Sequence, residues 1–167
     1  SDIARASVLR KYPEADQNNV VLWRMNDLVK NLGLTRTYFL NASGLDLSTT
    51  QAGAYGSARD VARLFIHAAS TSPSIFEQTS RDKISINPVN GTSLTAPNTD
   101  EALPAIPGLI LGKTGLTDLA GGNLAIVFEV GPAHPIVAVV LHSTGEGRFE
   151  DIRKLVEATQ VSIAHGW

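Results

Sequence analysis

Two apolar runs near the C-terminus constrain the fold of this chain more than any other feature. They span residues 123–130 and 135–142 and are joined by Gly131-Pro132-Ala133-His134. The runs hardly alternate between apolar and polar residues, which predicts an antiparallel pair of strands buried on both faces. Helical spacing then predicts a final amphipathic helix, carried by Phe149, Ile152, Leu155, Val156 and Thr159.

The first half of the sequence is predominantly helical in pattern. Apolar spacing predicts a short helix before Tyr12-Pro13 and a second helix over residues 16–32. Gly33 supplies the left-handed position that ends the second helix. A capping-box-like sequence opens a third helix over residues 57–69. Residues 35–48 lack helical periodicity, so we expect a structured loop there.

Strands are predicted between the third helix and the two apolar runs. Residues 83–87 and 92–95 flank Asn90-Gly91, a pair that favours a tight hairpin. Residues 96–107 are polar and rich in proline, which indicates a loop, and residues 108–113 form a short apolar strand. The fold class is therefore α+β, with helices first and an antiparallel sheet backed by a C-terminal helix.

Composition narrows the functional classes. The length of 167 residues and 43% hydrophobic content predict a single domain over residues 1–167. A net charge of -2 gives no electrostatic case for nucleic acid or an anionic membrane as a partner. Cysteine is absent, which excludes disulfides and thiolate chemistry. Metal-ligand spacing is also missing, so no metal or cofactor is predicted; the histidines are His67, His134, His142 and His165.

Other polar and aromatic residues receive ordinary structural interpretations. Asp100 and Glu101 form a carboxylate pair in a loop, and we expect both to be solvated. Trp23 and Tyr55 are expected to pack in a core, and a position lining a cleft is the alternative. Ser1-Asp2-Ile3 already resembles the interior of a helix, which indicates a chain truncated at its N-terminus.

Lys113-Thr114-Gly115 is the motif with the most chemical content. A strand that ends in this tripeptide beside a cleft offers an ammonium and a hydroxyl to a substrate carboxylate. Gly115 allows a peptide backbone to approach closely, and the backbone N–H of Leu116 is placed to donate to an oxyanion. A simple strand end followed by a turn is the alternative interpretation.

Further landmarks occur in a fixed order around this motif. Together they resemble the D-alanyl-D-alanine carboxypeptidases, the low-molecular-mass penicillin-binding proteins of serine peptidase family S11. The resemblance extends from about residue 1 to residue 156 and implies a partial β-lactamase/transpeptidase-like, or penicillin-recognising, fold. It rests on Met25-Asn26, Leu32-Gly33-Leu34, Thr37-x-Phe39, Asn41-x-x-Gly44-Leu45, Ser57-Ala58-Arg59-Asp60, Asn98, Thr117-Asp118-Leu119-Ala120-Gly121 and Arg148.

The resemblance also implies an activity. These enzymes remove the terminal D-Ala from peptidoglycan stem peptides outside the cytoplasm, through a serine acyl-enzyme that β-lactams also form. By position, Lys113 belongs to the catalytic site, and Thr114 and Gly115 belong to the strand that binds the substrate carboxylate. Leu116 contributes its N–H to the oxyanion hole. Many relatives carry a polar side chain at the position of Leu116, so substrate preference or rate is expected to differ.

The family's nucleophile motif, Ser-x-x-Lys, is expected upstream of this sequence. Ser80-Arg81-Asp82-Lys83 is its only match here, but it falls after the position of the second motif and reads as a surface loop. That second motif, Ser-x-Asn, falls near residue 1. Ser1 is a candidate for its serine, with Ile3 replacing the Asn; if the serine is the residue before Ser1, Asp2 replaces the Asn.

Two other classes remain open from the sequence: a β-lactamase or esterase relative, and a non-catalytic peptidoglycan-binding module. For the leading interpretation we expect the isolated chain to show no turnover and no acylation by penicillin. We also expect an exposed sheet edge, covered by a homodimer or by a complementing N-terminal fragment.

Overall fold

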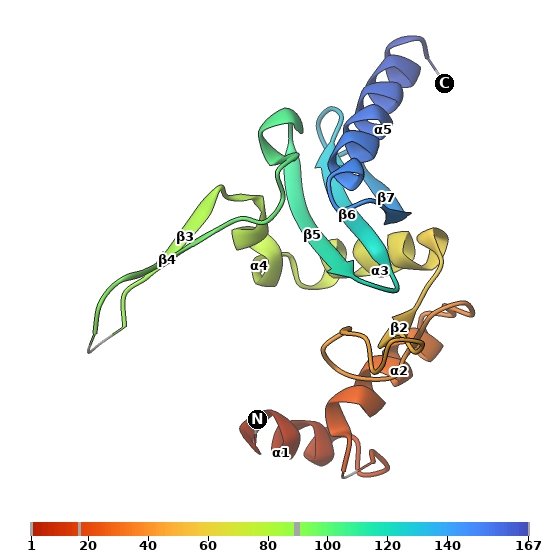
Figure 1. Ribbon diagram of the computed structural model, residues 1–167, viewed down its shortest axis with the longest axis vertical. Coiled ribbons are helices and arrows are strands. Elements are labelled where there is room, and N and C mark those ends of the chain that lie inside the picture. The colour runs from red at the N-terminus through yellow and green to blue at the C-terminus, as the bar shows by residue number, and fades with distance from the viewer. Residues whose placement is uncertain (1, 17, 89–90, 167) are drawn as a thin grey trace. The chain divides into compact units, whose positions relative to one another are not determined.

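A computed structural model describes residues 2–16, 18–88 and 91–166, with side chains from residue 5 onward. Ser1 and Asn90 therefore lie outside the described residues, as do the side chains of Asp2 and Ile3. The chain divides into two compact units. The first comprises residues 1–64 and 117–119, and the second comprises residues 65–116 and 120–167. Figure 1 labels the helices and strands.

The first unit begins with α1 (Asp2–Lys11) and α2 (Val20–Asn31). The short first helix is confirmed, and so is the end of the second, because Gly33 has a φ of 67°. The predicted start of the second helix at Asp16 is wrong. The Asp16 side chain accepts a hydrogen bond of 2.9 Å from the Asn18 N–H, which favours a turn over a helix at this position.

The predicted loop over residues 35–48 contains one short strand, β1 (Tyr38–Phe39), which pairs antiparallel with β2 (Ala54–Tyr55). Asn26 on α2 holds β1 in place. Its amide accepts a hydrogen bond from the Phe39 N–H (2.9 Å) and donates one to the Phe39 carbonyl (2.8 Å). Strands of two residues are too short to produce a periodic signal in the sequence.

The third predicted helix is α3 (Ala58–Thr71), and the boundary between the two units falls within it. Its predicted cap is confirmed, because the Ser57 hydroxyl accepts a hydrogen bond of 3.2 Å from the Asp60 N–H. Asp60 itself is buried. Its carboxylate accepts hydrogen bonds from the Arg36 N–H (2.7 Å) and from the Thr37 hydroxyl (3.2 Å).

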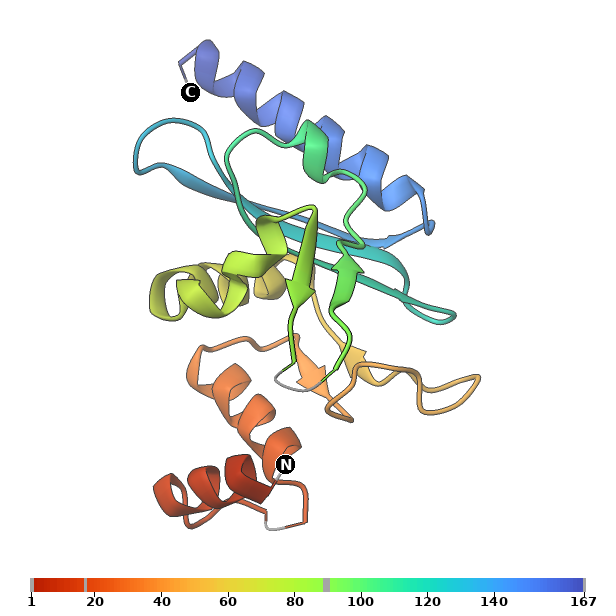
Figure 2. The same ribbon diagram turned by 90° about the vertical axis from the view of Figure 1, so that its left-hand side faces the viewer.

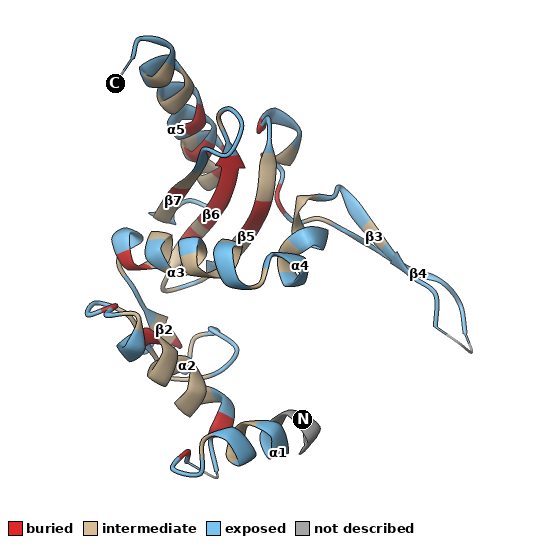
Figure 3. Ribbon diagram, turned by 180° about the vertical axis from the view of Figure 1, so that it is seen from behind, coloured by how far each residue is buried: buried red, intermediate tan, exposed pale blue. Residues whose placement is uncertain are grey.

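The second unit continues with α4 (Pro73–Phe76), the 3-10 turn η1 (Glu77–Ser80) and a hairpin of β3 (Lys83–Ile86) and β4 (Leu94–Pro97). The antiparallel pairing of these strands is confirmed, with Ile86 opposite Leu94. The predicted tight turn at Asn90-Gly91 lies partly outside the described residues. Figure 1 shows this ribbon projecting away from the larger sheet, and Figure 3 shows it almost wholly exposed.

The larger sheet has the order β5-β6-β7, formed by Leu109–Thr117, Gly121–Glu129 and Pro135–Ser143. The two apolar runs indeed form the antiparallel pair β6 and β7, with Ile126 opposite Ala138. The central strand β6 is buried on both faces, as predicted (Figure 3). The same prediction is wrong for β7, which is only partly buried because it is the outermost strand described.

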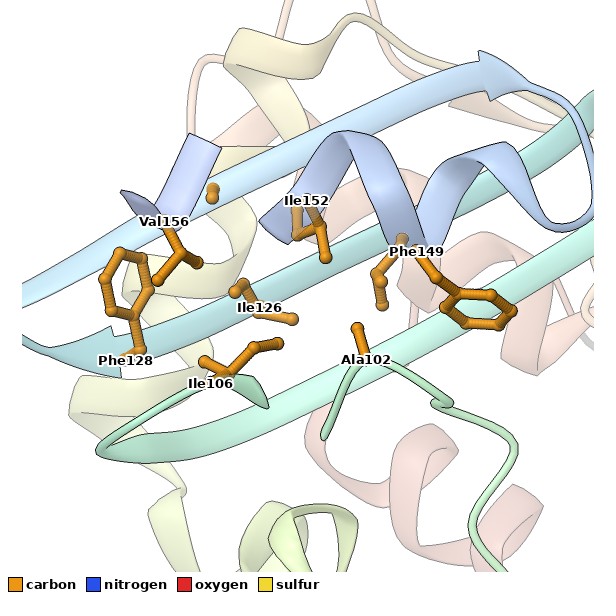
Figure 4. Close-up of a cluster of buried hydrophobic side chains, with 9 residues drawn as sticks. Ala102, Ile106, Ile126, Phe128, Phe149, Ile152 and Val156 are labelled. Atoms are coloured by element: carbon orange, nitrogen blue, oxygen red, sulfur yellow. The ribbon is translucent and has the colours of Figure 1, made fainter. Parts of the chain in front are cut away.

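A C-terminal helix, α5 (Gly147–Ala164), runs along one face of this sheet (Figure 2). Its buried residues Phe149, Ile152 and Val156 pack against β6, and the turn η2 (Leu103–Ala105) and its flanks close the same core. Figure 4 shows these side chains pointing toward one another; the cluster is Ala102, Ile106, Leu124, Ile126, Phe128, Ala138, Phe149, Ile152 and Val156. Leu155, predicted on the packed face, is 42% exposed.

Among the described residues, no helix combines the length and the apolar character that crossing a membrane requires.

Candidate active site along strand β5

Lys113-Thr114-Gly115 lies inside strand β5, not at its end. The sequence predicted a strand that stops at Lys113, whereas β5 continues to Thr117. The prediction followed apolar content, but the backbone remains extended beside β6 through the polar tripeptide. Lys113 is exposed, Thr114 is half-buried and Leu116 is 57% exposed. The tripeptide is therefore held by the sheet and still accessible.

The outer edge of β5 faces away from β6 and carries polar groups. The Gly112 N–H donates to the Thr79 hydroxyl at 3.1 Å, which marks this side of the strand as the free edge. Two residues further, the hydroxyls of Thr114 and Thr99 lie 2.7 Å apart. The Lys113 ammonium donates to the Thr114 carbonyl. A hydroxyl pair and an ammonium thus lie together at the strand edge.

A small cavity of about 240 Å³ lies beside this edge. Among the residues that the structure describes, Lys113, Lys83 and Arg81 line it, and no carboxylate does. Arg81 is paired with Glu77 at 3.0 Å, whereas neither lysine has an ion pair with a described residue. Such a lining favours an anion, and the volume suits the end of a chain that carries a carboxylate. The first unit holds a larger cavity of about 840 Å³ along α2, but it contains none of these groups.

Asn98, a landmark without an assigned role in the sequence, organises one wall of the cavity. Its amide nitrogen donates to the carbonyls of Thr79 (2.8 Å) and Arg81 (2.9 Å). Its amide oxygen accepts a hydrogen bond of 2.9 Å from the Asp100 N–H. The side chain of Asn98 therefore ties the loop after β4 to the turn η1, which in turn contacts β5.

Asp100 was expected to be solvated, and that prediction is wrong, because the residue is only 5% exposed. Its Oδ1 accepts a hydrogen bond of 3.0 Å from the Ala102 N–H, and its Oδ2 has no hydrogen-bond partner among the described residues. Burial raises the pKa of this carboxyl above its usual value, while the Ala102 N–H and the charges of Arg148 and Arg153 act in the opposite direction. Nothing in its loop sequence distinguishes it from its exposed neighbour Glu101.

Arg148, the late landmark, joins α5 to strand β5. Its Nη1 donates a hydrogen bond of 2.6 Å to the Gly115 carbonyl. The guanidinium carbon lies 4.6 Å from the centroid of the Phe149 ring, and Nε is buried without a partner among the described residues. Arg148 therefore fixes the backbone at the third residue of the tripeptide.

Ser80, from the Ser-x-x-Lys match, is not arranged as a nucleophile. Ser80 ends the turn η1, and its hydroxyl donates to the Glu77 carbonyl at 3.0 Å. It has no hydrogen bond to Lys83 in the described part of the chain, so the Ser-x-x-Lys match lacks the contact that activates a serine. Ser1, the other candidate serine, lies outside the described residues.

The remaining candidates contribute little. No group of three metal-binding side chains occurs in residues 2–16, 18–88 and 91–166. Tyr55 is 54% exposed, so its predicted packing in a core is wrong. Trp23 is half-buried and packs against Tyr12, with ring centroids 5.7 Å apart.

Comparison with known proteins identifies the class to which this fold and strand belong. The family model described as D-alanyl-D-alanine carboxypeptidase, peptidase S11, matches residues 7–145. The chain therefore belongs to the S11 family of D-alanyl-D-alanine carboxypeptidases. No curated protein matches the sequence.

Solved structures agree on the penicillin-recognising fold. Penicillin-binding protein D2 from Listeria monocytogenes, crystallised with ampicillin, is 31% identical with a TM-score of 0.69 and covers 86% of this chain. A D-alanyl-D-alanine carboxypeptidase from Mycobacterium tuberculosis is 23% identical with a TM-score of 0.64 and covers 81%. The enzyme DacD from Francisella tularensis is 18% identical with a TM-score of 0.70 and covers 83%. This chain spans only 57%, 53% and 44% of those three chains.

Proposed function

We propose that this chain is part of a serine-type D-Ala-D-Ala carboxypeptidase, which hydrolyses the terminal peptide bond of peptidoglycan stem peptides. One observation carries the proposal beyond family membership. Lys113 and Thr114 lie at the free edge of β5 beside a cavity whose described lining residues include lysines and hydroxyls but no carboxylate. An extended peptide with a terminal carboxylate fits such an edge, because it can pair with the strand and place its anion at the ammonium.

Each residue of the strand has a proposed role. Lys113 and Thr114 hold the substrate's terminal carboxylate, and Gly115 leaves room for the substrate backbone. The N–H of Leu116 stabilises the oxyanion that forms when a serine hydroxyl attacks the carbonyl of the penultimate D-Ala. The bond to the terminal D-Ala then breaks, the amino acid leaves, and water hydrolyses the acyl-enzyme. The attacking serine and its lysine base come from outside these 167 residues.

A fluorescent penicillin followed by mass spectrometry tests this assignment. The protein expressed from its complete gene is expected to form a covalent adduct, and the 167-residue chain alone is expected to form none. An adduct on the chain at Ser80 would overturn the placement of the nucleophile. Faster hydrolysis of penicillin than of a D-Ala-D-Ala peptide by the complete protein would favour a β-lactamase instead. Binding of peptidoglycan without any adduct would favour a binding module.

We further propose that residues 1–167 belong to a single catalytic domain, as its C-terminal part, and that the enzyme acts outside the cytoplasm on the cell wall. The outer edge of β7 has no strand partner among the described residues. A second copy of the chain or a complementing N-terminal fragment would cover that edge. Light scattering of the 167-residue chain should therefore show a dimer, and a stable monomer would contradict this part of the proposal.

A further inference from the structure

The carboxyl group of Asp100 lies directly behind the functional strand. An added Cβ on Gly112 would lie 3.3 Å from its Oδ2 and 3.5 Å from a methyl group of Ile126. Side chains two residues apart in a strand share a face, so Thr114 is on the same side of β5 as Asp100. Thr99, the neighbour of Asp100 in the loop, touches Thr114 on that side. The absence of a side chain at Gly112 is what allows the carboxyl to approach the strand.

The groups that face this carboxyl come from three elements. The loop supplies the N–H of Ala102, β5 supplies the bare backbone of Gly112, and α5 supplies the positive charges of Arg148 and Arg153. Arg153 is partly occupied elsewhere, since its Nε donates to the Phe149 carbonyl at 3.0 Å. Within the described residues, Arg148 has a buried Nε without a hydrogen-bond partner, and Asp100 has a buried Oδ2 without one. A donor and an acceptor of opposite charge are thus both left over beside the tripeptide.

A buried carboxyl of this kind is costly to the fold. Burial is the largest influence on its pKa and outweighs the two arginines, so the ionised form is held at a net cost in stability. Ionisable groups that burial perturbs in this way cluster at functional sites. Asp100 lies behind the Lys-Thr-Gly strand, so a role in positioning that strand would account for a buried carboxyl that lowers stability.

We propose that Asp100 is a positioning residue whose carboxylate orients the Arg148 guanidinium, and through it the Gly115 carbonyl and the strand that presents Lys113 and Thr114. This inference rests on the proposed function of that strand. No ion pair within 4.0 Å joins the two groups in the described residues, so the negative charge of Asp100 attracts the guanidinium through space, and the guanidinium donates to the Gly115 carbonyl. An asparagine has nearly the same shape but no charge, so it removes this attraction while it fills the same space.

The positioning can be measured on the 167-residue chain without any catalytic assay. In ¹⁵N NMR spectra recorded across pH, the Arg148 Nε–H and the amides of Gly112 and Gly115 should titrate together, with a midpoint above 3.8. The Asp100 carboxyl carbon should show the same midpoint in the wild-type chain, so the test needs no variant to fold. Asp100→Asn should remove the shared titration, and Glu101→Gln, a change at the exposed neighbour, should keep it. Independent midpoints, or a titration that survives in Asp100→Asn, would overturn the proposal.

Acylation of the protein expressed from its complete gene supplies the functional arm. Asp100→Asn should lower the second-order rate constant for a fluorescent penicillin by about 10- to 100-fold, the scale expected when a catalytic strand is slightly misplaced. The acid limb of the wild-type pH profile should share the NMR midpoint and should shift in the variant. Glu101→Gln should react at the wild-type rate. Equal rates for Asp100→Asn and wild type at every pH would overturn the role of Asp100. A wild-type protein that is never acylated would instead overturn the proposed function, and the NMR titration would then decide whether Asp100 positions Arg148.

Discussion

Each of the two units of this chain is stabilised by a different kind of interaction. In the second unit, β6 and α5 build a continuous apolar core, and the largest fully buried side chains all belong to that unit: Phe128, Leu111, Leu124, Ile126, Ile152 and Val127. In the first unit, the buried apolar residues are fewer and smaller: Ala15, Val20, Val29, Leu34 and Ala52. Hydrogen bonds from polar side chains to backbone groups compensate for this smaller apolar core.

Three family landmarks in the first unit are polar clamps of this kind. Asn26 holds both backbone groups of Phe39, and Asp60 holds the N–H of Arg36. Asn41 accepts hydrogen bonds from the N–H groups of Ser43 and Gly44. In the second unit, by contrast, Lys113 lies in β5, Arg148 donates to the Gly115 carbonyl of that strand, and Asn98 holds the turn η1 that contacts it. The landmarks of the family therefore stabilise loops in the first unit, and in the second unit they lie in β5 or beside it.

The largest expected effect breaks the apolar core of the second unit. Phe128 is completely buried, so Phe128→Ala should lower the free energy of unfolding by about 3–5 kcal/mol through lost burial and the cavity left behind. Urea unfolding followed by circular dichroism measures the change. Val161→Ala on α5, at a residue 52% exposed, is the control and should change little. A loss below about 1 kcal/mol for Phe128→Ala would mean that this core is not what stabilises the unit.

A smaller effect should follow from removing a clamp in the first unit. Asn26→Ala leaves two backbone groups of Phe39 without their partner, at a cost of about 1–3 kcal/mol in the free energy of unfolding. Trp23, on the same helix, provides a fluorescence signal for this unit. Asn31→Ala removes only an exposed side-chain bond to Asp27 and should be nearly neutral. If the two variants unfold at the same urea concentration, the hydrogen bonds of Asn26 to Phe39 do not stabilise the first unit.

The smallest stability effect concerns Asp100 and has a defined pH dependence. Its pKa is raised in the folded state, so both states bind the proton well below pH 3.8, and the cost of burying the charge appears as pH rises through the folded pKa. Asp100→Asn should therefore stabilise the fold at pH 7, and the gain should shrink toward pH 3. Urea midpoints at the two pH values test this against Glu101→Gln, which should show no such difference. A variant less stable than wild type at pH 7 would contradict the sign.

Sequence patterns predicted the parts of the fold that strong periodicity specifies. Apolar spacing that continues over many residues made the pair β6–β7 and the final helix predictable. The helix after Ser57 was predictable from its cap together with such spacing. The ribbon β1–β2 escaped prediction because its pairing depends on Asn26, more than ten residues away in the chain. The start of α2 was misplaced because a side-chain bond from Asp16 competes locally with helix formation.

The candidate site was predictable only in its linear part. Lys113-Thr114-Gly115 stood out as a motif, and Asn98 and Arg148 stood out as landmarks. The burial of Asp100 could not be predicted from the sequence. It depends on the space that a glycine leaves at position 112 and on two arginines of α5 that are distant in sequence. The extension of β5 past Lys113 was also hidden, since pairing with β6 keeps a polar segment extended.

The comparison between Lys113 and Lys83 tests the central claim most directly. Both lysines line the same cavity, but only Lys113 belongs to the proposed carboxylate-binding strand, and Lys83 belongs to the misplaced Ser-x-x-Lys match. In the protein expressed from its complete gene, Lys113→Ala should slow acylation by a fluorescent penicillin by about 100-fold or more, the scale of losing one electrostatic partner of the reacting centre. Lys83→Ala should have a much smaller effect, because Lys83 lines the cavity from β3 and contributes only to its positive field. Equal losses in the two variants, or a greater loss for Lys83→Ala, would contradict the assignment of β5 as the substrate-binding strand.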